Sequence, residues 1–533
     1  MTRRTRTSAR AATILVVIVA ASVGFPAVMA AWGALQASGA VVPESATVSA
    51  AVDWARLGWT VLTAGLIGAL ASACAWPAAW AARSLSARWF VLLLVPMLMP
   101  SYLAYIGWSE LRAPRTPLGN WLMDAGGGEV GANWRPAAAA RASAVLGLVL
   151  WSWPLATLIL SAQVRGIDRG VLEALRLERA SAWRRGLTLV AMTRSGLVAG
   201  AAAVTLLMLG SAVPMHLAQF ETYAIKLWFL LDLTPVERHA RVWLAAWPLV
   251  VLAAGAGLWI GRRAAGGGEP GDPGLEPVRG HDRAGWVAIV ATMVLWLASV
   301  GVPLELMRRN LEGPRDLRLF WNTHAQAFAV SGSVAAVVAV LGVVIAAAVW
   351  IGLGPWRGGS VARGVTRAAV VVLLVAGLLP GILIGSASAA AWNRTGLNSP
   401  AIGLGAVVLA HAARLGFVAA LVGAWAWRME SAERREMRAL DGGDSFAGWF
   451  RGALPTQLGP VLSVGVAVGL LSFHEIEAAV MLQPPGLGSF PLQMLQLLHY
   501  NRMGDLSAGV VLVGGCGLAA AALVVVLAGI RRR

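Results

Sequence analysis

Apolar stretches separated by short polar segments follow one another along almost the whole chain. Twelve of them are about 20 residues long, which is enough for a helix to cross the hydrocarbon core of a bilayer. A helix satisfies its own backbone hydrogen bonds in lipid, so the pattern predicts an all-α membrane protein with about twelve transmembrane helices. The expected spans are Ala11–Trp32, Leu57–Ala82, Trp89–Glu110, Ala142–Val164, Gly196–His216, Val242–Ile260, Gly285–Pro303, Ala325–Gly352, Ala368–Trp392, Ala401–Trp427, Val461–Leu482 and Leu506–Ile530.

The first of these spans has a second interpretation. A basic segment, Thr2–Arg10, precedes it, and Ala27–Ala30 resembles the small-residue cleavage site of a secretory signal. The apolar run from Ala11 to Trp32 is long for a signal, which favours a retained first helix over a cleaved one.

Composition agrees with the membrane class. Of the 533 residues, 58% are hydrophobic and 13% are charged, and the mean hydropathy is +0.69, which excludes an ordinary soluble domain. The net charge of +17 is spread through the polar segments and is not gathered in one tract that would bind nucleic acid. Cys74 and Cys516 both lie in apolar runs and offer neither a disulfide framework nor a metal-ligand pattern.

A glycine- and proline-rich segment divides the chain into two halves. Residues 262–283 contain the sequence GGGEPGDPG, which is typical of an exposed linker, and six expected spans lie on each side of it. Leu93–Pro100 (LLVPMLMP) corresponds to Leu373–Pro380 (LLVAGLLP), which indicates an internal duplication. We therefore expect two parallel six-helix repeats, residues 1–261 and 284–533, joined by the linker.

Two polar segments, at about residues 167–191 and 430–460, interrupt the apolar pattern at corresponding places in the halves. Each combines a helix-forming run with apolar residues at i, i+3 or i+4 spacing, as in a short capped amphipathic helix. An even number of spans separates them, so both are expected on the same face of the bundle. Their repetition favours a docking surface for a soluble partner over two solvated loops. Corresponding residues are Glu173 and Glu436, Leu177 and Leu440, Ser181 and Asp444, Trp183 and Phe446, and Leu187 and Phe450.

The placement of arginines predicts the orientation in the membrane. Most of them fall in the N-terminal segment, the linker, the two polar segments and the C-terminus, which lie on one side of the twelve-span layout. The positive-inside rule therefore predicts that both chain termini are cytoplasmic. The basic segment Arg308–Arg318 falls on the outer side and is an exception.

Catalytic and cofactor motifs are absent from the sequence. A P-loop needs a lysine for the nucleotide phosphates, and the only lysine, Lys226, follows no glycine-rich loop. No metal-ligand spacing, G-x-S-x-G motif or H-E-x-x-H motif occurs. We therefore expect no catalytic residue, metal site or cofactor in this chain, and any work driven by ATP would be done by another polypeptide.

The polar segments resemble the EAA loops of type I ABC-transporter permeases, whose pattern is Glu-Ala-Ala, then a glycine, then Leu-Pro. The first segment matches at Glu173-Ala174, but Arg179 stands at the glycine position and the Leu-Pro pair is missing. The second segment matches the EAA pattern at Glu436, Gly442, Leu454 and Pro455, with Met437 and Arg438 in place of the alanines.

A further stretch, Glu475–Tyr500, resembles the end of the fused permeases of the ferric-iron type, to which thiamine, anion and polyamine importers are similar.

The resemblance implies a permease subunit in the inner membrane of a bacterial cell, forming the pathway for a small solute, with iron(III) as the best match. It implies two copies of a cytoplasmic ABC ATPase that bind ATP and grip the loops, an extracytoplasmic substrate-binding protein, surrounding lipid, and no nucleic acid. The residues implied in ATPase coupling are Glu173, Ala174, Leu177, Trp183, Leu187, Glu436, Leu440, Gly442, Phe446, Trp449, Phe450, Leu454 and Pro455.

Ionisable residues inside the expected spans are candidates for the transport pathway, because charge is costly in lipid and usually faces a cavity or a partner. They are His474, Glu475 and Glu477 in one span and Arg414, with His411, in the preceding one. An ion pair between Arg414 and Glu475 that only holds helices together is an equally good interpretation.

Two other functions fit the same pattern. An ion-coupled secondary transporter can also have six plus six spans, with buried titratable groups for coupling. A membrane scaffold without transport activity is the third interpretation, since the first polar segment departs from the EAA pattern.

Overall fold

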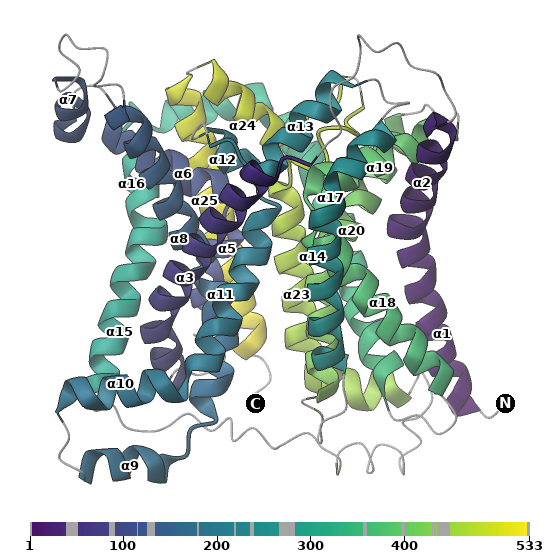
Figure 1. Ribbon diagram of the computed structural model, residues 1–533, viewed down its shortest axis with the longest axis horizontal. Helices are drawn as coiled ribbons and strands as arrows, with labels where there is room; N and C mark the ends of the chain where they lie inside the picture. Colours follow the sequence, from purple (N-terminus) through teal and green to yellow (C-terminus); the bar gives the residue numbers. More distant parts are fainter. Residues whose placement is uncertain are drawn as a thin grey trace.

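The computed structural model is a bundle of helices that run between two opposite faces (Figure 1). The described residues form helices and connecting turns, with no β-strand among them. They are residues 3–38, 52–84, 91–113, 116–124, 134–177, 181–217, 220–234, 239–265, 283–354, 360–395, 400–428, 430, 433, 448–484, 486–500 and 502–529.

The chain is an all-α, multi-pass membrane protein. Nine helical segments of its described part are long and apolar enough to cross a bilayer. The bent pair of α10 (Ala182–Met192) and α11 (Arg194–Leu209), which meet at 63°, adds a tenth only if its two helices count as one span. The nine are α1 (Arg3–Val19) continued by α2 (Phe25–Ser38), α3 (Trp54–Ser84), α8 (Trp134–Arg165), α14 (His239–Ala265), α15 (Arg283–Trp296) continued by α16 (Val302–Arg308), α17 (Pro314–Leu353), α18 (Ser360–Leu378), α20 (Pro400–Arg428) and α25 (Met503–Gly529).

Four expected spans are interrupted. Three of them, Trp89–Glu110, Gly196–His216 and Val461–Leu482, supply none of the nine helices, whereas Ala368–Trp392 still contributes α18. Pro100 and Pro380 have no N–H to donate and take ψ angles of 130° and 132°, outside the helical range. Trp89–Glu110 consists of η3 (Val91–Leu94), α5 (Val95–Leu98) and α6 (Ser101–Ser109), and Ala368–Trp392 contains the end of α18 and α19 (Gly381–Asn393). Gly196–His216 is divided between α11 and α12 (Val213–Leu217), and within Val461–Leu482 the helix α23 (Leu454–His474) ends at His474.

Several elements follow one another in a similar order in the two parts of the chain, as the expected duplication would require. A π-helical turn, η1 (Ala20–Gly24) or η6 (Leu297–Gly301), precedes Pro26 in one series and Pro303 in the other. Proline removes one backbone donor and pushes against the carbonyl four residues earlier, so the wider turn accommodates it. The other corresponding elements are α3 and α17, α6 and α19, α8 and α20, α11 and α23, α13 (Tyr223–Leu233) and α24 (Phe490–His499), and α14 and α25.

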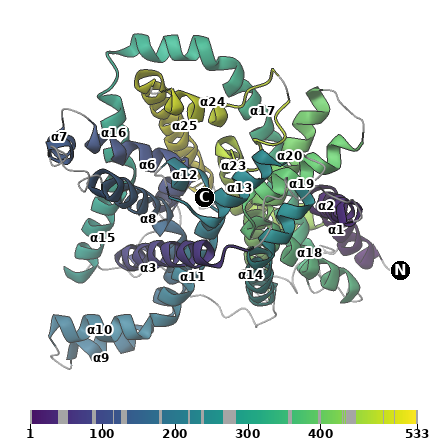
Figure 2. The same cartoon turned by 45° about the horizontal axis from the view of Figure 1, so that its top comes forward.

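Helices from the two series are interleaved in space. The first helix of each series packs on the other series: α1 lies against α17 and α18, whereas α15 lies against α3. The last helices also reach the other series: α14 packs on α18, and α25, which packs mainly on α23, α16 and α17, also contacts η3 and α5. Figure 2 shows α1 and α2 beside α18 and α19, and α15 at the opposite side. Each series therefore completes its packing with helices of the other.

Small residues allow these helices to approach closely, as is usual where lipid supplies no hydrophobic driving force between helices. Gly68 of α3 lies against α11, where a methyl group would overlap the Thr205 hydroxyl and the Ala201 carbonyl oxygen. At Gly65, on the same helix, the corresponding methyl position has no atom within 4 Å. The two glycines therefore differ in what they contribute to the fold.

We expect Gly68→Ala to lower the stability of the purified protein in detergent by about 1–3 kcal/mol, because the added methyl group overpacks the contact between α3 and α11. Gly65→Ala is the matched control and should be neutral or stabilising by up to about 1 kcal/mol, since alanine is the better helix former. Thermal unfolding of both variants checks this. Equal melting temperatures would contradict the packing described here.

Candidate functional site

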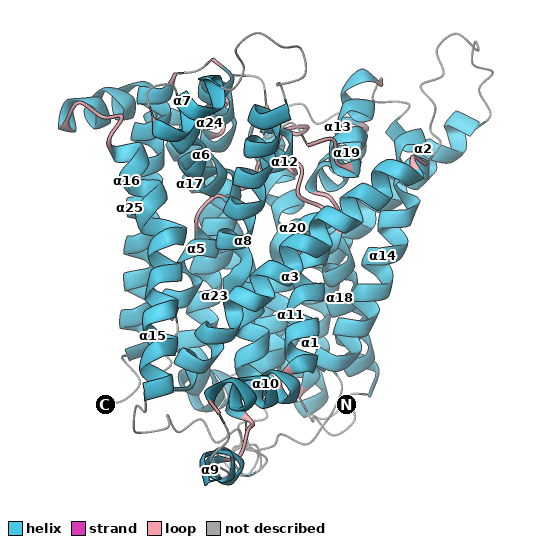
Figure 3. Ribbon diagram, turned by 60° about the vertical axis from the view of Figure 1, so that its left-hand side comes forward, coloured by secondary structure: helices cyan, strands magenta, loops and turns pink. Residues whose placement is uncertain are grey.

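Two short helices project from one face of the bundle. α9 (Arg169–Leu177) and α10 lie along the edge at which α1 begins and α25 ends (Figures 1 and 3), and α9 lies further out than α10. The Ser181 hydroxyl caps α10 by accepting a 3.3 Å bond from the Arg184 amide. Arg83 donates to the Ile167 carbonyl at 2.8 Å, and Arg165 donates to the Ala82 carbonyl at 3.1 Å. The first bond ties the segment before α9 to the end of α3, and the second joins the ends of α8 and α3.

Large apolar side chains on this projection are exposed. The exposed fraction is 81% for Leu177, 74% for Trp183 and 49% for Leu187, and Glu173 and Ala174 are exposed as well. Exposed apolar side chains that are gathered on one surface are typical of a site that contacts a protein or a membrane. All five residues expected to couple to a partner in the first half are therefore accessible.

The corresponding segment of the second half is described only in part. Glu436, Leu440, Gly442 and Phe446 lie outside the described residues. Phe450 is exposed, Pro455 is exposed and Leu454 is half-buried.

Trp449 does not face a partner, and this corrects the expectation that it fills a partner's groove. It is 3% exposed, and its ring packs edge to face on Trp350 with centroids 5.0 Å apart. Its apolar cluster includes Ala11 and Leu15 of α1. The aromatic residue thus joins the start of α23 to α17 and α1.

Polar groups also gather at the two helix breaks that precede Pro100 and Pro380. A break before a proline leaves carbonyl oxygens without an intrahelical donor, and each must find another partner in lipid. In the first series Trp151 of α8 donates its indole N–H to the Met99 carbonyl at 2.7 Å. In the second series Arg414 of α20 donates to the Leu379 carbonyl, and to the Gly377 carbonyl at 2.6 Å. Corresponding helices therefore stabilise corresponding breaks with different side chains.

Arg414 is surrounded by the other ionisable residues of the bundle interior. Glu475 and Glu477 follow α23, and both lie beside Gly381, the first residue of α19. Glu475 accepts from the Ala478 amide at 3.1 Å, within its own turn. His411 shares a 2.8 Å hydrogen bond with Ser472. The expected ion pair between Arg414 and Glu475 is not formed between these two described residues, because the guanidinium is used by the backbone carbonyls.

Glu477 bonds a turn that lies 265 residues away in the sequence. One of its carboxylate oxygens accepts from the Ala212 amide at 2.7 Å and from the Val213 amide at 3.3 Å, between α11 and α12. The side chain is 8% exposed. His474, the remaining pathway candidate, is half-buried at the end of α23. Sequence reasoning missed Trp151 and the two amides. Trp151 is the residue of the first half that corresponds to Arg414 in the expected duplication, so that correspondence could have indicated it.

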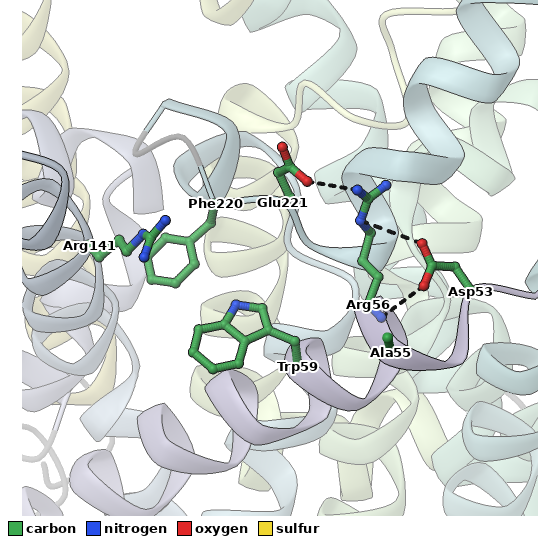
Figure 4. A pocket seen from close by; sticks show the side chains of 7 residues that line it. All are labelled: Asp53, Ala55, Arg56, Trp59, Arg141, Phe220 and Glu221. Carbon is green, nitrogen blue, oxygen red and sulfur yellow. Dashed lines mark hydrogen bonds and ion pairs between the residues drawn. The ribbon is translucent and has the colours of Figure 1, made fainter. Parts of the chain in front are cut away.

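A hollow of about 470 Å³ opens near the face opposite to α9 and α10. Figure 4 shows Arg56 between two carboxylates: it bonds Glu221 at 2.7 Å, and its backbone amide donates to Asp53 at 3.0 Å. That backbone bond is the main cause of the lowered pKa of Asp53, which Lys226 lowers further. The Arg141 guanidinium lies 5.9 Å from the centre of the Phe220 ring. The hollow can therefore offer charged and aromatic groups to a polar molecule.

Comparison with known proteins finds no relative. No family model, no curated protein and no solved structure matches the chain. The functional interpretation therefore rests on the residues and the geometry described above.

We expect Arg414→Leu to destabilise the protein by on the order of 2–5 kcal/mol, because two buried carbonyl oxygens lose their donor. Arg428→Leu on the same helix is the control: its bond to the Arg263 carbonyl, at 3.1 Å, is exposed, so the change should stay within about 0.5 kcal/mol. Thermal unfolding in detergent measures both. A melting temperature of Arg414→Leu equal to that of the control would contradict the assigned role.

The stacked imidazoles of His216 and His499, whose ring centroids are 6.1 Å apart, predict a pH dependence. Burial, and then the nearby His499, lower the pKa of His216 below its ordinary value of 6.5. The unfolded chain then binds the proton more tightly than the folded one, so stability should fall as the pH drops below about 6.5. Replacing His216 by Phe should reduce this fall in melting temperature between about pH 7 and about pH 5. An undiminished fall in the variant would refute the assignment.

Proposed function

We propose that the chain is the membrane permease subunit of an ATP-driven importer and that it carries both permease halves. The observation that carries the proposal is the exposed apolar surface of α9 and α10, with Leu177 at 81% and Trp183 at 74% exposure. A short helix that presents such residues outside the bundle fits the groove of a soluble protein. The resemblance of the same segment to an EAA loop supports an ABC ATPase as that protein.

The way in which the projection is attached supports this proposal. Arg83 of α3 bonds the Ile167 carbonyl just before α9, and Arg165 of α8 bonds the end of α3, so a displacement of α9 would be passed to α3 and from there to α8. In the second half Phe450 would meet the partner, whereas the buried Trp449 would pass the movement to Trp350 of α17. The same order of elements in both series fits two copies of one ATPase, each gripping one half.

Under this proposal the pathway runs between two parallel six-helix repeats and alternates its access. The face that bears α9 and α10 is cytoplasmic, as are both chain termini, in the inner membrane of a bacterial cell. An extracytoplasmic binding protein delivers the solute to the opposite face, where the hollow beside Arg56 and Arg141 opens. Iron(III) is the proposed substrate, from the resemblance of the stretch Glu475–Tyr500 to ferric-iron permeases.

A second candidate function is an ion-coupled secondary transporter. The buried residues Arg414, Glu477 and His411, with the half-buried Glu475, favour it, because such carriers need titratable groups away from water. Transport by the reconstituted protein, supplied with an ATPase and a binding protein encoded beside it, separates the two functions. Dependence on ATP supports the importer and dependence on an ion gradient supports the carrier. If no transport occurs under either condition, the remaining interpretation is a membrane scaffold without transport activity.

We expect Trp183→Ala to weaken binding of the ATPase at least tenfold, since a buried tryptophan anchor is worth about 2 kcal/mol or more in an interface. Trp121→Ala is the matched control, because Trp121 is 56% exposed on the separate helix α7 (Pro117–Asp124). Pull-down and titration with the purified ATPase measure the effect. Unchanged binding by Trp183→Ala would remove the observation on which the proposal rests.

A further inference from the structure

The contact between Glu477 and the turn after α11 joins equivalent positions of the two series. α11 ends at Leu209 and α23 ends at His474, so Ala212 and Glu477 are each the third residue after the corresponding helix. Residues at equivalent positions of a duplicated structure can touch only close to the axis that relates the copies. The bond therefore lies where the two series meet, and so does any passage that runs between them.

The two turns fit closely at this place. Gly210 of the first series faces Pro380, with only 3.3 Å between the position of an added methyl group and the proline Cα atom. At Gly381 a methyl group would lie 2.7 Å from Cβ of Glu477, so glycine is what leaves room for this side chain. The carboxylate receives two amide donors through Oε1, whereas Oε2 is buried and has no hydrogen-bond partner. One buried oxygen is thus left for a partner that this arrangement does not provide.

Only one of the two equivalent positions carries a charge. Counted from the ends of α11 and α23, the position that corresponds to Glu477 is Ala212, which offers its backbone amide. The bond between carboxylate and amide therefore occurs once, and no second carboxylate makes the reverse bond. Glu475, two residues earlier, also accepts from a backbone amide, but that amide belongs to its own turn. Glu477 is therefore buried and bonds across the boundary between the series, whereas Glu475 is half-buried and bonds within its own turn.

We propose that Glu477 is a latch that seals the passage between the halves and that opens when the turns after α11 and α23 separate. A carboxylate at a dry interface is stabilised only while it is paired or hydrated. Its two charge-assisted bonds hold the sealed state. When the turns part, water that enters the passage replaces the two amides and reaches Oε2. The inference rests on the proposed passage between the halves, but not on ATP or on any partner.

The experiment measures passive leak in vesicles that contain the purified full-length chain, without ATP, ATPase or binding protein. Efflux of radioactive sodium is the probe. We expect Glu477→Ala to speed efflux about tenfold over the wild type, which corresponds to about 1.4 kcal/mol. Glu477→Gln should leak at an intermediate rate, because neutral acceptors bind the amides less strongly. Glu305→Ala is the control and should remain as tight as the wild type, because the Glu305 carboxylate pairs with the neighbouring Arg308 and Arg309 and takes no part in the latch.

Gly381→Ala tests the same latch with the glutamate retained, since the added methyl group displaces the Glu477 side chain and should raise the leak as well. Gel filtration and melting temperature show which variants are folded. If Glu477→Ala does not fold, Glu477→Gln and Gly381→Ala decide the matter. Folded variants as tight as the wild type, or an equal leak from Glu305→Ala, would overturn the latch. A leak with the expected pattern but no ATP-driven uptake would refute the importer and leave the latch standing.

Discussion

Every backbone carbonyl and amide in the bundle interior needs a partner, because lipid offers none. Most of the chain meets this requirement by remaining helical. Where α18 stops at Pro380, Arg414 supplies the missing donors, and where η3 and α5 stop before Pro100, Trp151 supplies one. Where α23 stops at His474, the two glutamates that follow accept amides of two different turns. The polar residues of the interior are therefore placed by the backbone that they satisfy.

The hydrophobic pattern was sufficient to predict an all-α membrane protein and the approximate position of its spans, but not where the helices break. Proline alone does not decide this, because Pro77, Pro154 and Pro248 lie inside the continuous helices α3, α8 and α14. What distinguishes Pro100 and Pro380 is a side chain on a neighbouring helix that donates a hydrogen bond to the carbonyl oxygen just before the proline. That donor is distant in sequence, so a local pattern cannot reveal it.

The candidate site was predictable to a similar degree. Spacing indicated that Phe446, Trp449 and Phe450 share a helical face, but spacing does not say whether a face meets a partner or the protein's own core. The structure places Trp449 in the core and Phe450 outside. Glu477 was recognisable as an ionisable residue within an apolar stretch, whereas its partners are backbone amides of Ala212 and Val213, which any residue except proline would provide. Side-chain chemistry in a sequence thus points to a site and leaves its geometry open.

The exchange of first helices between the series has a consequence for biosynthesis. α1 finds its neighbours on α17 and α18, which the ribosome makes some three hundred residues later, at Pro314–Leu353 and Ser360–Leu378. Domains usually fold as units soon after they leave the ribosome, but α1 cannot reach its final packing until α17 and α18 have been made. The earliest inserted segment must wait in the bilayer until the later helices arrive, so the first half has no finished form of its own.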